Sequence, residues 1–142
     1  MAGTCTDLAA AGTAIATANT DDANSAAQSI GFNFNGTASS KFVLNTNGFV
    51  RLGAAPPSAP GLFLGETSSN IDPILSSDPA DINILAPFNF DLAAGTAAGG
   101  TEYRVVTTGT QPNRVCTVQW KNVLDKAGSA DTQYSLPVLV SN

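Results

Sequence analysis

The chain has 142 residues, a net charge of −5 and no histidine, and only 12% of its residues are charged. Without imidazole, Ser-His-Asp and Cys-His nucleophiles, His-containing zinc sites and facial-triad iron sites are excluded. The six basic residues are scattered along an acidic chain, which gives no electrostatic basis for binding nucleic acid or an anionic membrane. The length fits one domain, residues 1–142, with a single core.

The first 28 residues are rich in Ala and Thr and predict a weakly ordered N-terminal segment. They contain no basic region followed by an unbroken apolar stretch, so no export signal is recognisable. The longest apolar runs elsewhere are about five residues, against the roughly 20 that a membrane-spanning helix needs. We therefore expect no membrane insertion, and a mature fragment whose signal was removed.

Residues 29–53 carry the clearest pattern, because apolar residues recur at every second position and Asn-Gly pairs interrupt them. A period of two is typical of a half-buried strand, and Asn-Gly favours the positive φ angles of tight hairpin turns. Both residues of Asn47-Gly48 are expected to adopt positive φ. The segment predicts three antiparallel strands in succession, with one face buried.

Residues 54–81 contain five prolines, which exclude a long helix or a central strand. The segment is nevertheless too apolar for a disordered linker, since it carries Leu62, Phe63, Leu64, Ile71, Ile74 and Leu75. We expect a long loop packed across one end of the domain, of a kind that often carries function.

Strand patterns return after this loop, over residues 82–90, 101–110, 114–123 and 132–142. Short strands at regular spacing joined by polar turns predict an all-β fold, a two-sheet antiparallel β-sandwich of jelly-roll or immunoglobulin-like type. The predicted core consists of the inward-facing residues of these strands: Ile30, Phe32, Phe34, Phe42, Leu44, Val50, Leu52, Ile84, Val105, Cys116, Val118 and Trp120.

Acidic and amide side chains in turns offer the oxygen ligands that calcium prefers. Asp21, Asp22 and Asn24 form one such cluster, and Asp78 with Asp81 a second. Neither has the spacing of an EF-hand loop, and Asp and Asn are also ordinary turn residues. Calcium is the one cofactor that we consider, and the alternative is that these residues only shape turns.

Two cysteines, Cys5 and Cys116, are compatible with one disulfide that closes a long loop. The alternative is that Cys116 is an inert buried thiol on the face it shares with Trp120. Asn35-Gly36-Thr37 fits the glycosylation acceptor pattern, although Asn-Gly between strands is first a turn.

Catalysis by a carboxylate pair would have to use residues such as Glu66 and Glu102, which lie in no recognisable motif. A sugar platform would need Trp120, Tyr103 or Tyr134, and the position of Trp120 on an apolar strand face favours a core role.

Several segments follow one another in a characteristic order: GFNFNGT, KFVLNTNGFVRLG, a Pro-rich loop, INILAPFNFDL and NRVCTVQWKNV. This series resembles the N-terminal β-sandwich module of bacterial surface proteins that use the type IX secretion pathway. The chain is also similar, more weakly, to nidogen-type extracellular domains, which share the NGF hairpin and the APF strand. The matched segments span about residues 29–123.

The resemblance implies a non-catalytic extracellular or cell-surface module, with no catalytic residues to carry over. We therefore predict a structural and adhesive role beside neighbouring surface domains. The alternatives are a carbohydrate-binding module and, less favoured, an enzyme using a carboxylate pair.

Such modules continue into a further strand after the last segment of this chain, which raises the question of strand exchange. The segment 132–142 is uncharged and alternates Leu136, Val138 and Val140, so it has the character of a strand donated to another copy of the chain. Head-to-tail donation would build a fibre. The alternative, slightly favoured, is that this segment folds back into its own sandwich.

Overall fold

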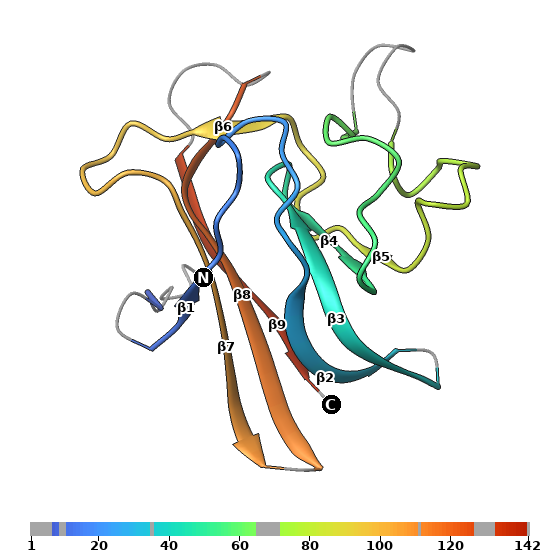
Figure 1. The fold of residues 1–142 in the computed structure, drawn as a ribbon. Coiled ribbons are helices and arrows are strands. Elements are labelled where there is room, and N and C mark those ends of the chain that lie inside the picture. The colour runs from blue at the N-terminus through green and yellow to red at the C-terminus, as the bar shows by residue number, and fades with distance from the viewer. Residues whose placement is uncertain are drawn as a thin grey trace, which may run out of the picture.

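The computed structural model describes residues 7–8, 11–34, 36–64, 72–110, 112–126 and 133–141, with the backbone alone for Phe34 and residues 133–141. The described residues form strands, turns and no helix (Figure 1). The strands are β1 (Thr13–Ala14), β2 (Gln28–Phe34), β3 (Thr37–Asn45), β4 (Phe49–Leu52), β5 (Ile84–Leu85), β6 (Leu92–Ala94), β7 (Glu102–Thr110), β8 (Asn113–Asp125) and β9 (Gln133–Ser141).

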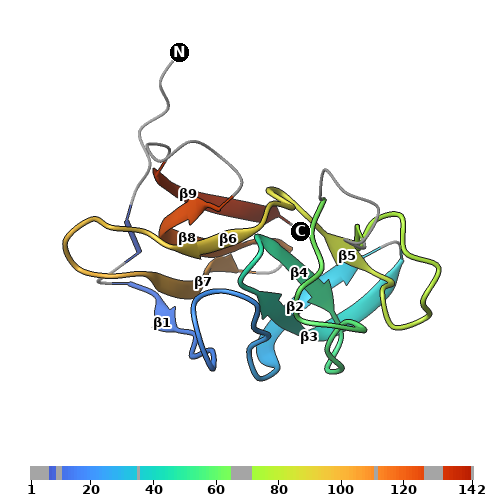
Figure 2. The same cartoon turned by 90° about the horizontal axis from the view of Figure 1, so that it is seen from above.

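The strands form two antiparallel sheets, which confirms the predicted all-β sandwich (Figures 1 and 2). One sheet has the order β2-β3-β4-β5, so the meander predicted from residues 29–53 is present. In the other sheet, β8 is the central strand. β7 pairs with the first part of β8 and β6 with its last part, while β9 pairs with residues in both parts of β8. Some residues of β8 pair with both β7 and β9, and others with both β6 and β9. β7 and β6 therefore lie one after the other along one edge of β8, and β9 lies along the opposite edge.

The backbone of β8 is irregular at the point where its partner changes from β7 to β6. Asn122 has a left-handed conformation with φ 52°, and the register between β8 and β9 shifts between Trp120 and Val123. The Asn122 side chain accepts a hydrogen bond from the Ala97 N–H at 3.1 Å and donates one to the Ala97 carbonyl at 2.9 Å. Asn tolerates this conformation better than other side chains, and here it fixes the loop from β6 to β7.

The core contains most of the predicted residues. Ile30, Phe42, Leu44, Val50, Leu52, Cys116, Val118 and Trp120 are buried in one cluster, with Phe32 and Val105 packed against it. The prediction of Ile84 was wrong: Leu85 pairs with Val50 and packs against the core, while Ile84 pairs with Arg51 on the opposite face. The side chain of Phe34 lies outside the described part of the chain. The sequence pattern did not identify Ile15, Leu92, Tyr103 and Val123, which also belong to the cluster.

The turn between β3 and β4 differs from the expected two-residue turn. Asn45 pairs with Phe49, so the loop comprises Thr46, Asn47 and Gly48. Of these only Gly48 has a positive φ, at 83°, and the expectation for Asn47 was wrong. A turn that ends in one left-handed glycine is the common three-residue hairpin connection.

The long loop after β4 lies against the outer face of β3 and β4. Arg51 donates hydrogen bonds from Nε to the Ala80 carbonyl at 2.6 Å and from Nη1 to the Ala55 carbonyl at 2.8 Å. Phe49, on this outer face, is fully buried, as is Leu62 of the loop. Leu64, Ile74 and Leu75, which we expected to anchor the loop, are exposed, and Ile71 lies outside the described residues.

The two glycines of the meander turns give a matched pair of variants. A Cβ added at Gly48 would lie 2.5 Å from the Phe88 Cβ and 3.1 Å from the Leu92 Cδ1, whereas one at Gly36 (φ 77°) would meet nothing within 4 Å. Gly48→Ala combines an unfavourable φ with overpacking and is expected to lower the free energy of unfolding by about 3 kcal/mol. Gly36→Ala carries only the backbone cost, about 1 kcal/mol.

Urea denaturation followed by Trp fluorescence measures both. If both variants lost the same free energy of unfolding, the methyl group at position 48 would not be overpacked and the prediction would be wrong.

Candidate functional site

The turn between β3 and β4 is polar in sequence and buried in the structure. Asn45, Thr46 and Asn47 are each 0% exposed. Burying a polar group without a hydrogen-bond partner destabilises a fold. The segments packed around this turn must therefore supply its hydrogen-bond partners.

Asn45 joins three separate parts of the fold. Its Nδ2 donates to the Asn24 Oδ1 at 2.7 Å and to the Pro60 carbonyl at 2.9 Å. Its own carbonyl accepts from the Trp120 Nε1 at 3.0 Å. The segment before β2, the long loop and the opposite sheet are therefore held at one residue.

Asn47 holds the neighbouring segments in the same way. Its Oδ1 accepts from the Leu92 N–H at 3.0 Å, and its Nδ2 donates to the Asp22 Oδ1 at 3.0 Å. Asp22 belongs to the segment before β2, and Leu92 begins β6. One buried amide thus fixes two chain segments that each carry acidic residues.

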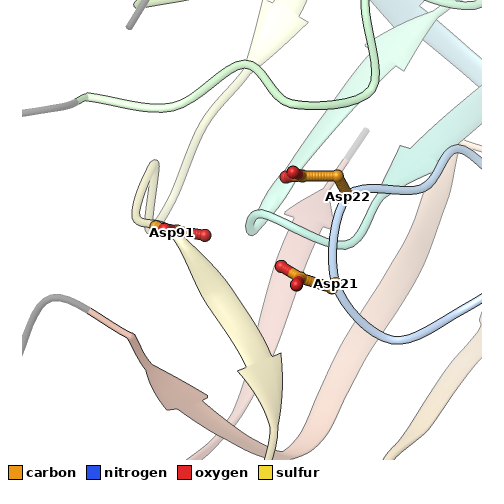
Figure 3. A group of neighbouring side chains, drawn as sticks. All are labelled: Asp21, Asp22 and Asp91. Atoms are coloured by element: carbon orange, nitrogen blue, oxygen red, sulfur yellow. The ribbon is translucent and has the colours of Figure 1, made fainter.

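Those segments bring together Asp21, Asp22 and Asp91. One carboxylate oxygen from each lies within 4.8 Å of the others. Figure 3 shows the three side chains converging from two separate segments on one space. This is the densest group of acidic side chains in the described part of the chain, and we define it as the acidic cluster.

Burial and like charge both act on the acidic cluster. Burial raises the pKa of Asp91, and the charges of Asp21 and Asp22 raise it further, against the opposing effect of Lys126. The Lys126 ammonium lies 3.1 Å from the Asp21 Oδ2 and 3.7 Å from the Asp91 Oδ1, the second beyond hydrogen-bond distance. One cation therefore compensates part of the charge of three carboxylates.

The calcium hypothesis named a trio that the structure brings together only in part. Asp21 and Asp22 are in the acidic cluster, whereas the Asn24 Oδ1 accepts from Asn45. Asp91 was missed because its partners are distant in sequence and nothing near it repeats a ligand spacing. Three carboxylates offer hard oxygen ligands, and calcium binding stays a prediction.

The second acidic pair does not form a common site. Asp78 accepts from the Ala80 N–H at 2.8 Å within its own turn. Asp81 accepts from the Ser58 N–H at 2.8 Å and from the hydroxyls of Ser58 and Ser76 at 2.7 and 2.6 Å. Burial opposes the ionised form of Asp81, but these hydrogen bonds prevail and lower its pKa. Its contribution to stability is therefore present above its unfolded pKa and is lost as the pH falls through the lowered folded value.

Other candidate residues have mainly structural surroundings. The Cys116 thiol is buried, and burial raises its pKa; Cys5 lies outside the described residues, so the disulfide stays a prediction. Trp120 is 0% exposed and Tyr103 4%, which places both in the core. Glu102 binds the Arg104 Nε at 2.6 Å.

Three further candidates lie outside the part of the chain with described side chains. They are Asn35, Glu66 and Tyr134.

Residues 1–141 match the family described as NIDO related, and the chain belongs to that family. The match supports the likeness to nidogen-type extracellular domains and indicates an extracellular-type structural domain. The likeness to the module of type IX-secreted proteins stays a hypothesis. No curated protein and no solved structure matches the chain.

None of the described residues belongs to a helix long and apolar enough to cross a bilayer.

The role of Asn47 is tested by truncation. Asn47→Ala leaves the buried Leu92 N–H without an acceptor and removes the hydrogen bond to Asp22, so we expect the free energy of unfolding to fall by about 3 kcal/mol. Asn33→Ala, at an exposed position of β2, is the control and should change it by about 0.5 kcal/mol or less. A small loss in Asn47→Ala would contradict a central role for this side chain.

The calcium hypothesis is tested by thermal unfolding at neutral pH with calcium or with a chelator. At ten times its dissociation constant, calcium should stabilise the domain by about 1.4 kcal/mol, a shift of a few degrees in Tm. The shift should vanish in Asp22→Asn and in Asp91→Asn. It should also vanish as the pH falls through the raised pKa of Asp91, because calcium then competes with a proton. An unchanged Tm at millimolar calcium would contradict the hypothesis.

Proposed function

We propose that this NIDO-related domain is a non-catalytic structural and adhesive module of the cell surface or extracellular space. The observation that carries the proposal is the family match over residues 1–141. The absence of histidine supports it, because the common hydrolytic nucleophile systems need imidazole. The low charge content also fits an extracellular β domain whose surface is built from Thr, Ser and Asn.

Hydrogen bonds between the layers of the fold support a structural role. The Trp120 indole donates across the interface between the sheets to the Asn45 carbonyl, and Asn45 also binds the long loop. Directional hydrogen bonds between layers resist sliding of one sheet over the other, which apolar packing alone does not. A module that must keep its shape between neighbouring domains benefits from such ties.

The two alternatives have less support. In a carbohydrate-binding module, aromatic rings usually stack on the sugar, but Trp120 and Tyr103 are buried. An enzyme using a carboxylate pair would need free carboxylates, and Glu102 is held by Arg104. We retain both as hypotheses that activity and glycan screens can exclude.

Localisation and adhesion are tested on intact cells that produce the protein. An antibody to the domain should label the cells without permeabilisation. Beads coated with the folded domain should adhere to the matching cell surface or matrix, and soluble domain should compete with them. Labelling only after permeabilisation, or adhesion equal to that of albumin-coated beads, would contradict the proposal.

Self-association through β9 is a further proposal, and the pairing of β9 defines its test. β9 pairs with β8 of its own chain from Val115 to Leu124, the arrangement that the internal alternative expects. A fibre would require this strand to exchange between chains. Deletion of residues 132–142 should then give soluble, folded monomers in place of polymers, as seen by light scattering. A monodisperse monomer of the intact chain at high concentration would contradict self-association.

A further inference from the structure

A cavity of about 430 Å³ lies beside Arg114 of β8 and the paired strands β2 and β3. It is lined by Ile30, Gly31, Phe32, Asn33, Ala38, Ser39, Ser40 and Arg114. Arg114 continues the alternation of Cys116, Val118 and Trp120, which all belong to the core. A charged side chain thus stands on the face of β8 that looks toward the other sheet.

The backbone of β2 is shaped to receive this guanidinium. The pairing of β2 with β3 shifts between Ser29 and Phe32, so β2 carries one extra residue there, a β-bulge. Gly31 lies in the bulge, and a Cβ on it would be 2.8 Å from the Nη1 and 3.2 Å from the Nη2 of Arg114. Glycine therefore allows this close approach, and a larger residue at position 31 would displace the flexible end of the Arg114 side chain.

Arg114 lacks an anionic partner among the described residues. Its Nε is buried and makes no hydrogen bond, and no acidic residue lines the cavity. By contrast, Arg104, Lys121 and Lys126 form ion pairs, and Arg51 donates to backbone carbonyls. Lys41 also has no ion pair there, but it is exposed to water. A half-buried cation that has no anionic partner among the described residues, in a chain of net charge −5, is typical of a site that takes an anion.

We propose that this cavity binds the carboxylate of an acidic sugar, a uronic acid, with Arg114 as its anchor. The guanidinium fork matches a carboxylate, and its single charge balances one. A phosphate dianion would need a second cation, which the lining does not contain. Asn33, Ser39 and Ser40 supply amide and hydroxyl groups for sugar hydroxyls, and Ile30 with Phe32 supplies an apolar wall for the ring. The volume lies in the range of small-molecule sites.

This inference goes beyond the structural role proposed above and does not depend on it. It gives the carbohydrate-binding alternative a specific site, in which Ile30 and Phe32 take the place of the buried Trp120 and Tyr103.

Calorimetric titration of the intact chain with glucuronate tests the proposal, with glucose and glucuronamide as neutral ligands of the same size. Glucuronate should bind and the neutral ligands should not. Arg114→Gln should weaken binding by about tenfold or more, since it removes a charge-assisted hydrogen bond. Lys41→Gln removes another cation that has no ion pair among the described residues. Lys41 is not part of the cavity lining, so this variant should change the affinity by less than about twofold.

Arg114→Lys keeps the charge and loses the fork, so its affinity should lie between those of the wild type and Arg114→Gln; it also decides the question if Arg114→Gln does not fold. Absence of glucuronate binding, equal binding of glucose, or unchanged affinity in Arg114→Lys and Arg114→Gln would overturn the proposal. Cyclohexanecarboxylate has one carboxylate on a ring of similar size but no hydroxyl groups. If it bound as tightly as glucuronate, the sugar assignment would be overturned, because the hydroxyl groups would then play no part.

Discussion

The buried amides of Asn45 and Asn47 are the constraint on which the rest of this fold depends. Three consecutive polar residues at the tip of a hairpin have no access to water, so their hydrogen bonds must be made within the protein. The partners come from the segment before β2, the long loop, β6 and the indole of Trp120. An apolar turn could be covered by any side chains of suitable volume. This polar turn can be covered only by segments that place hydrogen-bond donors and acceptors opposite its own.

The same network sets the position of the acidic cluster. Asn47 binds Asp22 directly and the N–H of Leu92, the residue after Asp91. The approach of two segments that carry like charges is unfavourable in itself. The pKa of Asp91 is raised first by burial and then by the charges of Asp21 and Asp22. Lys126 offsets part of it. The position of the acidic cluster therefore follows from the hydrogen bonds that Asn47 makes at the hairpin tip, independently of calcium.

The sequence predicted the meander, the alternation of β8 and most of the core because these depend on local periodicity and turn chemistry. The prediction that Ile84 is in the core was wrong because a strand of two residues is too short to show an alternating pattern. The prediction of a positive φ at Asn47 was wrong because the turn has three residues instead of two. Asp91 and Gly31 have partners that are distant in sequence. Asp91 is placed by the hydrogen bond that the next residue, Leu92, makes at the hairpin tip, and Gly31 lies beside Arg114 of the other sheet. The exposed Leu64, Ile74 and Leu75 show that apolar composition alone does not locate the anchors of a loop.

Native-state hydrogen exchange tests the central claim most directly, because the Leu92 N–H is held by a side chain and the Ala23 N–H by the Thr46 hydroxyl. If the hairpin tip fixes the fold, both amides should exchange only by global unfolding, with free energies equal to that of the slowest amides in β8. Exchange of these two amides through local opening, several kcal/mol below the global free energy of unfolding, would contradict the account.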